Sequence, residues 1–200
     1  MPHLVPLLIR GINNLSDARY CAGMGADKLT FVLDPAVSGH LNPQTVRELA
    51  GWIAGVELIG EFDELSAPEI NALAAECGLD AVLLRTMRTA EDLAEIAPPV
   101  YVELPYETLT AAFDEVVLEA PAGWVLELPA SVSAETIEIL ATIGRQRALW
   151  LGPGLHPARA RDLARQLPLA GLSFPSGNEV KPGLRDFDRL EAVFEALEVD

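Results

Sequence analysis

Short apolar runs alternate with helical patterns eight times along this 200-residue chain. The runs are nearly continuous in hydrophobicity, as are strands that are covered on both faces. Each unit is about 25 residues long, which suits one βα step. Eight strictly alternating units predict the α/β class and a compact (β/α)8 TIM barrel with a parallel, eight-stranded sheet. We expect one domain over residues 1–200, with an open doubly wound sheet as the alternative.

The expected strands share a short apolar core and are Val5–Gly11, Lys28–Leu33, Val56–Phe62, Ala81–Arg85, Val100–Leu104, Trp124–Leu128, Ala148–Gly152 and Ala170–Phe174. Between them, helix starts are indicated by polar N-cap residues followed by an early proline or carboxylate, at Ser16, Asn42, Ser66 and Ser133. Pro105–Glu119 is the weakest of the helical patterns. On strand 7, Trp150 is expected to pack against the surrounding helices.

Charge and composition exclude several partners. The formal net charge is −16, whereas nucleic-acid binding needs clustered Lys and Arg to neutralise phosphates. The same charge disfavours an anionic membrane surface, and we find no signal peptide and no apolar run of 18 residues. Cys21, Cys77 and the three histidines show no metal-ligand spacing, so we expect no metal and no cofactor. A cytoplasmic location follows by default.

Two glycine turns near the end of the chain point to an anion site. Leu151–Pro157 (LGPGLHP) and Gly171–Asp188 (GLSFPSGNEVKPGLRDFD) each follow an apolar run and precede a helical pattern. A strand, a glycine turn and a helix start together direct backbone N–H groups toward an anion. In (β/α)8 barrels the loops after strands 7 and 8 form the usual phosphate site, and we expect these turns to be those loops.

Three stretches carry a family resemblance. Leu8–Ala18 (LIRGINNLSDA) is similar to K-I-C-G-I-T-x-x-x-D-A, and Gly25–Val32 (GADKLTFV) is similar to G-A-D-x-x-G-F-V. Ser176–Asp186 (SGNEVKPGLRD) is similar to S-S-G-V-E-x-x-P-G-x-K-D. These motifs belong to the phosphoribosylanthranilate isomerases of tryptophan biosynthesis, which are compact (β/α)8 enzymes, and the resemblance runs nearly end to end.

The resemblance implies catalytic roles at positions that this chain has changed. In the family's Amadori rearrangement a general acid protonates the furanose ring oxygen, and a general base then removes the C2′ proton. The base is a cysteine where this chain has Arg10, and a guanidinium cannot accept a proton at any workable pH. The acid is an aspartate where this chain has Glu127, which keeps the carboxyl but moves it by about one methylene. Three further substitutions replace an arginine after strand 2 by Gly39, a histidine on strand 4 by Arg85 and an aspartate on strand 8 by Ser173.

The phosphate loops keep more of the family pattern. The family's Ser-Gly-Gly-Leu reads Gly152-Pro-Gly-Leu155 here, and Pro153 removes one backbone N–H from a place where such groups are ligands. In the last loop Pro175 replaces a serine. The predicted phosphate-binding residues are Gly152, Gly154, Ser176, Gly177 and Asn178. The alternative is that the glycines persist only because the turns need a positive φ.

Side-chain alternation along barrel strands places the substituted residues together. The position that aims the family's cysteine into the barrel aims Arg10 there too, and Arg85, Glu127 and Ser173 follow by the same matching. Glu103 joins them, and the pattern leaves the facing of Glu61 open. One interpretation is a new polar pocket in which Glu127 acts as the acid. The other is an ion-pair plug, in which Arg10 and Glu127 form a salt bridge because buried charges must be paired.

Three functions follow from these residues. The first is a diverged isomerase homologue without efficient isomerase activity that binds a small phosphorylated metabolite at the C-terminal face. The second is an authentic isomerase that uses another base, Glu103 or Glu61. The third is a non-catalytic structural or regulatory barrel. The sequence is compatible with a monomer or a homodimer.

Overall fold

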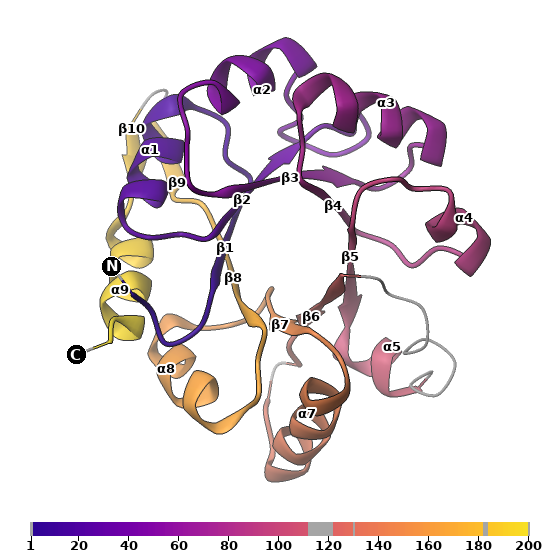
Figure 1. Ribbon diagram of the computed structural model, residues 1–200. Helices are drawn as coiled ribbons and strands as arrows, with labels where there is room; N and C mark the ends of the chain where they lie inside the picture. Colours follow the sequence, from indigo (N-terminus) through magenta and orange to yellow (C-terminus); the bar gives the residue numbers. More distant parts are fainter. Residues whose placement is uncertain (1, 112–121, 130, 182–183, 200) are drawn as a thin grey trace.

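The computed structural model describes residues 2–111, 122–129, 131–181 and 184–199, and its centre is a closed parallel barrel in the order β1 to β8 (Figure 1). All eight strands expected from the apolar runs are present. Their bounds are β1 Leu7–Arg10, β2 Lys28–Val32, β3 Glu57–Phe62, β4 Ala81–Leu84, β5 Val100–Pro105, β6 Gly123–Glu127, β7 Leu149–Leu151 and β8 Gly171–Pro175. Pairing of β8 with β1 closes the ring, which confirms the barrel and excludes the open sheet.

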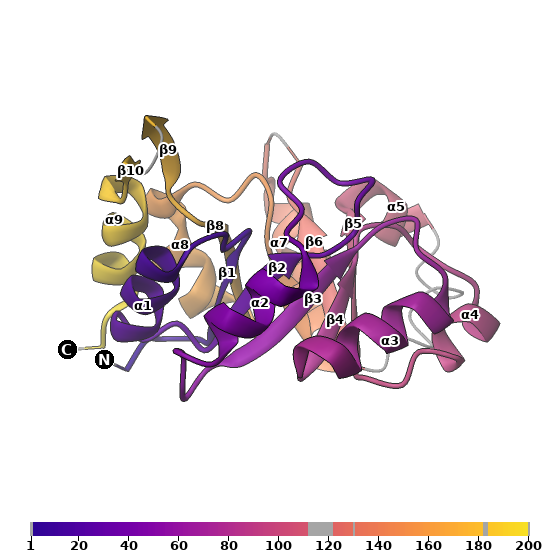
Figure 2. The ribbon, with the colours of Figure 1, turned by 90° about the horizontal axis from the view of Figure 1, so that it is seen from above.

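Helices surround the barrel on its outer side (Figures 1 and 2). Their bounds are α1 Leu15–Gly23, α2 Pro43–Ala50, α3 Ala67–Cys77, α4 Ala90–Ala94, α5 Tyr106–Ala111, α7 Ala134–Gln146, α8 Pro157–Gln166 and α9 Asp188–Leu197. The predicted helix Pro105–Glu119 begins as α5, and its part beyond Ala111 lies outside the described residues. Within the described ranges, no helix combines the length and apolar character that crossing a membrane requires.

Helix starts follow the predicted caps with one correction. Asn42 and Ser133 accept hydrogen bonds from backbone N–H groups of the first turn, and Ser66 forms a reciprocal capping box with Glu69. Helix α1 is capped by Asn14, whose side chain accepts from the Asp17 N–H at 2.9 Å, rather than by Ser16. The chain therefore enters α1 two residues earlier than the sequence pattern indicates.

The barrel encloses a core of its own, separate from the layer between strands and helices. Seven buried residues, one or two from each of six strands, form this inner cluster: Leu8, Ile59, Ala81, Leu83, Tyr101, Val125 and Trp150. The expected packing of Trp150 against helices is therefore wrong, because its position on β7 faces inward. Gly171 on β8 makes room for the indole, since a Cβ there would lie 2.2 Å from a ring carbon of Trp150.

A short antiparallel hairpin follows the barrel's last strand and was not expected from the sequence. Its strands are β9 Asn178–Lys181 and β10 Leu184–Asp186. Figure 2 shows the hairpin standing beyond the end of β8, next to the first turn of α9. The end of the barrel where the strands terminate is therefore bounded on one side by this hairpin.

Candidate functional site

Four inward positions of the odd-numbered strands form one layer across the mouth of the barrel. The four are Arg10 on β1, Glu61 on β3, Glu103 on β5 and Gly152 directly after β7, and each lies two residues beyond an inner-cluster residue of its strand: Leu8, Ile59, Tyr101 and Trp150. Such four-residue layers from alternate strands are the regular packing of TIM barrels. Three members of this layer are charged, and the fourth has no side chain.

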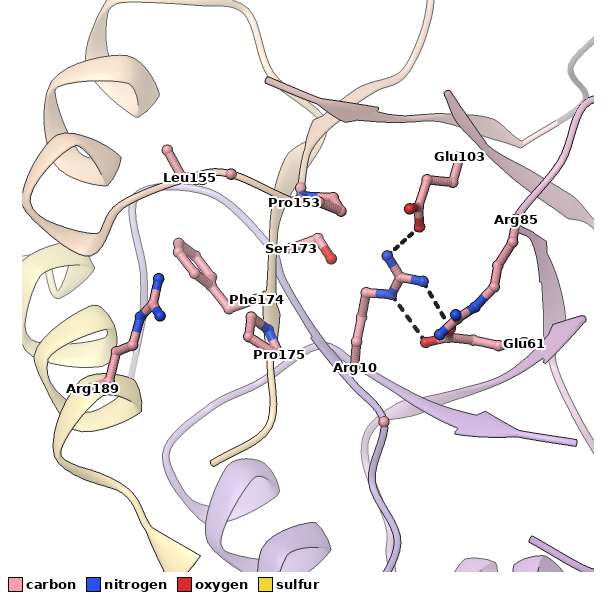
Figure 3. Close-up of a pocket in the computed structure, with 13 residues that line it drawn as sticks. Arg10, Glu61, Arg85, Glu103, Pro153, Leu155, Ser173, Phe174, Pro175 and Arg189 are labelled. Atoms are coloured by element: carbon pink, nitrogen blue, oxygen red, sulfur yellow. Dashed lines mark hydrogen bonds and ion pairs between the residues drawn. The ribbon is translucent and has the colours of Figure 1, made fainter. Parts of the chain in front are cut away.

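Arg10 lies between the two glutamates of this layer (Figure 3). Its Nε and Nη2 donate to Glu61 Oε1 and Oε2 at 3.0 and 2.7 Å, which is a bidentate ion pair. Its Nη1 donates to Glu103 Oε2. Burial alone lowers the pKa of Arg10, but the two glutamates raise it, and the resulting pKa lies above the ordinary value. The guanidinium is therefore held protonated.

Glu61 is the centre of the network. Its side chain is fully buried. Its carboxylate accepts hydrogen bonds from Arg10 Nε and Nη2, from Thr30 Oγ1, and from Arg85 Nε and Nη2 at 3.0 and 2.9 Å. Burial acts to raise the pKa of Glu61. The contacts with Arg10, Thr30 and Arg85 outweigh burial and lower the pKa to about 2. We call Arg10, Glu61, Arg85 and Glu103 the mouth cluster.

The predicted Arg10–Glu127 salt bridge is wrong. Glu127 is exposed at the end of β6, and no described residue forms an ion pair with it. The reason is the barrel register: Glu127 pairs with Pro105, two residues beyond Glu103 on β5, so it lies closer to solvent than Glu103 does. Arg10 meets carboxylates of its own layer instead.

A cavity of about 450 Å3 opens beside the mouth cluster, so the cluster does not fill the barrel mouth. It is lined by Arg10, Gly11, Glu61, Arg85, Glu103, Gly152, Pro153, Gly154, Leu155, Ser173, Phe174, Pro175 and Arg189. Gly152 contributes no side chain to this lining, and a Cβ there would lie 2.8 Å from the Val125 side chain. Its size is in the range of small-molecule sites.

The predicted phosphate residues fall into two groups. Gly154 lines the cavity with a φ of +85°, and its N–H donates to no described residue. Gly152 also lines the cavity, but its N–H donates to Leu126 O at 2.9 Å. The Ser176 N–H donates to Arg10 O at 2.7 Å, and its hydroxyl donates to Gly11 O at 3.0 Å. In the first loop, Gly154 is therefore the residue whose backbone donor remains available.

The other last-loop residues lie farther along the chain. Gly177 borders a small hollow of about 50 Å3 beside the cavity, and Asn178 begins β9. Ser173, predicted as a pocket residue, is 2% exposed and lines the main cavity, where its hydroxyl has no described hydrogen-bond partner. The geometry thus brings Arg10, Arg85, Glu103 and Ser173 together as predicted and leaves Glu127 outside.

Two lining residues were missed or unassigned by sequence reasoning. Glu61 faces inward because it is two residues beyond Ile59 on β3, and this alternation was the signal that could have placed it. Arg189, on the first turn of α9, reaches the cavity from a helix outside the barrel, and no strand pattern indicates such a contact. Among the described residues, no group of three His, Cys, Asp or Glu side chains could hold a metal ion.

The fold and the site define a (β/α)8 barrel with a polar cavity at the end of the strands, where enzymes of this architecture bind their substrates. No protein-family model matches the chain. Curated relatives match it over nearly their whole length. They include N-(5'-phosphoribosyl)anthranilate isomerases of Chlorobium chlorochromatii (27% identity, 99% of both chains) and Chlorobaculum parvum (29% identity, 96% of this chain and 95% of the relative). Over nearly its whole length, the chain is therefore similar in sequence to phosphoribosylanthranilate isomerases.

Solved structures agree on the fold. Phosphoribosyl anthranilate isomerase of Thermotoga maritima superposes with a TM-score of 0.81 at 23% identity, covering 96% of this chain and 98% of the other. A structure of phosphoribosyl anthranilate isomerase in complex with reduced 1-(o-carboxyphenylamino)-1-deoxyribulose 5-phosphate also has a TM-score of 0.81 at 23% identity. It covers 96% of this chain and 97% of its own.

Proposed function

We propose that this chain is a diverged phosphoribosylanthranilate isomerase homologue that lacks efficient isomerase activity and binds a small phosphorylated metabolite at the C-terminal face of the barrel. The observation that carries the proposal is the pairing of Arg10 with Glu61 and Glu103. At the position where the family resemblance implies the general base, this chain has a cation whose pKa its two partners raise. A protonated guanidinium has no lone pair with which to accept a proton.

Retained anion binding is supported by groups at the end of the cavity opposite the mouth cluster. Gly154 supplies an N–H with no described partner, and Arg189 supplies a cation with no described ion pair. Local positive groups matter here because the chain as a whole carries a formal charge of −16. The ligand in one solved isomerase structure is a 5-phosphate, which is consistent with phosphate binding in this fold.

The isomerase assay tests the first half of the proposal. Purified protein mixed with phosphoribosylanthranilate should show no decay of substrate fluorescence above the uncatalysed rate. The triple variant Arg10→Cys, Gly39→Arg and Glu127→Asp, which restores three family residues, should regain measurable turnover if the barrel still positions the phosphate. Robust turnover by the wild-type chain would refute the proposed loss of activity.

One observation favours a second candidate, an isomerase that uses a different base. Glu103 lines the cavity with a side chain that is 20% exposed, and its Oε1 accepts from no described group. Glu61 is unsuited to that role because its oxygens are fully engaged and its pKa is about 2. Under this alternative the wild-type chain turns over and Glu103→Gln abolishes turnover, whereas Glu135→Gln, on an exposed residue of α7 outside the cavity, leaves turnover unchanged.

A further inference from the structure

The cavity at the barrel mouth has two chemically different ends. In Figure 3, Arg189 and Leu155 lie on one side of Ser173, and the mouth cluster lies on the other side. A ligand that fills this space therefore meets one set of groups with its first end and another set with its second end. The charges of each set decide which ligand can bind.

The mouth cluster is electrically balanced. Its two arginines and two glutamates carry opposite charges, and the arginines direct five hydrogen bonds to the two carboxylates. What remains for a ligand is Glu103 Oε1 as an acceptor and Arg85 Nη1 as a donor, neither of which has a described partner. Donor and acceptor side by side suit hydroxyl groups, which can do both. A ligand carboxylate at this end would lie close to that of Glu103 and be repelled.

Ser173 adds a second group that suits a hydroxyl. It is buried on β8, lines the cavity, and leaves its Oγ without a described partner. A buried hydroxyl without a partner has lost its hydrogen bonds to water, so a partner from within the cavity stabilises the protein. Since the cavity is the space that this side chain borders, a bound molecule can supply the missing hydrogen bond.

The opposite end of the cavity is cationic. Arg189 borders both the main cavity and the small hollow under Ser176 and Gly177. No described carboxylate lies within salt-bridge distance of its guanidinium. Gly154, in the turn after β7, adds an N–H donor to the same lining. A guanidinium and a backbone N–H together form a site that matches a phosphate group.

We infer that the cavity selects a phosphorylated polyol or sugar that has no carboxylate, with its phosphate at Arg189 and Gly154 and its hydroxyls at Ser173, Glu103 and Arg85. This inference rests on the proposed phosphate binding and adds the ligand's class and orientation. Leu155 and Phe174, which also line the cavity, contact the carbon skeleton of such a ligand. The discrimination comes from Glu103, which accepts from a hydroxyl and repels a carboxylate.

Isothermal titration calorimetry on the full chain tests the inference with a matched set of probes. Ribose 5-phosphate and 5-phosphoribonate differ in the carboxylate at C1, and inorganic phosphate and ribose are the two part-ligands. We expect ribose 5-phosphate to bind at least about tenfold more tightly than 5-phosphoribonate and about tenfold more tightly than inorganic phosphate. Glu103→Gln should bring the two sugar derivatives within about threefold of each other.

Three variants separate the two ends of the cavity. Ser173→Ala should weaken ribose 5-phosphate about fivefold and leave inorganic phosphate unchanged. Arg189→Ala should weaken every phosphate-bearing probe about tenfold. Arg165→Ala, on an exposed residue of α8 outside the cavity, is the matched control and should change neither. The melting temperature of each variant shows that a lost affinity does not reflect unfolding.

The outcomes distinguish this inference from the proposed function. If 5-phosphoribonate binds as well as ribose 5-phosphate, or if Arg189→Ala changes nothing, the inference is overturned while phosphate binding stands. If no phosphate-bearing probe binds, both are overturned.

Discussion

Replacing Glu61 by glutamine is expected to destabilise the protein strongly, and only above acidic pH. Glu61 is fully buried and accepts hydrogen bonds from Arg10, Arg85 and Thr30. On folding, its pKa falls from an ordinary value of 4.5 to about 2. A fall of this size corresponds to about 3 kcal/mol of unfolding free energy at neutral pH. Loss of one partner from a buried ion pair leads to a similar expectation of about 3–5 kcal/mol.

The pH dependence gives this prediction its sign. A carboxyl whose pKa is lowered by folding stabilises the protein above its unfolded pKa, and this stabilisation disappears as pH falls through the folded pKa. The difference between wild type and Glu61→Gln should therefore be about 3 kcal/mol at pH 7, roughly half of that at pH 3, and nearly zero at pH 2. Urea unfolding followed by circular dichroism at each pH measures it.

Glu57→Gln is the matched control for this experiment. Glu57 lies on the same strand and pairs with Lys28, but its side chain is 32% exposed. Such a pair contributes about 1 kcal/mol or less, with a correspondingly weak pH dependence. If Glu61→Gln behaved like Glu57→Gln, or if its effect stayed constant between pH 7 and pH 3, Glu61 would not be the buried, ionised centre of the mouth cluster.

Three further outcomes are expected. Burial acts to raise the pKa of Asp34, but hydrogen bonds from four backbone N–H groups outweigh it and lower the pKa below its ordinary value. Asp34→Asn should therefore reduce the unfolding free energy, measured with urea, by about 2 kcal/mol at pH 7 and by less at pH 3. Equal costs at both pH values would contradict this. Trp150→Ala should cost about 3–5 kcal/mol by emptying the barrel interior, and Trp150→Phe clearly less; a cost below 1 kcal/mol would place the indole elsewhere. Gly154→Ala should lower the melting temperature by roughly 3–5 °C. The φ of +85° at this position is strained for alanine, and the new Cβ lies 3.1 Å from Leu128 O. An unchanged melting temperature would show that the turn tolerates a side chain.

Features set by local patterns could be predicted from the sequence. The ends of the eight strands lie within two residues of the ends of the apolar runs, because a strand covered on both faces needs continuous apolar residues wherever it lies in the barrel. The inward facing of Arg10, Arg85 and Glu103 follows in the same way from the two-residue repeat of a strand. The β9–β10 hairpin carries no comparable apolar pattern and was missed.

Features set by closure of the barrel could not be predicted locally. The partner of Arg10 depends on the register of all eight strands, which places Glu61 and Glu103 in its layer and Glu127 in another. Trp150 faces inward because Gly171, on the neighbouring strand, leaves space for its ring. Both outcomes depend on contacts between residues that are far apart along the chain.

By itself, the sequence determined the fold class, the resemblance to phosphoribosylanthranilate isomerases and the presence of Arg10 where that resemblance implies a cysteine, because these are written in short contiguous motifs. The tertiary structure alone decided what that arginine does. It is held between Glu61 and Glu103 beside an open cavity, with Arg189 at the cavity's other end. The physical reason is that a charge removed from water must be balanced by whichever opposite charges the closed barrel brings within a few ångströms.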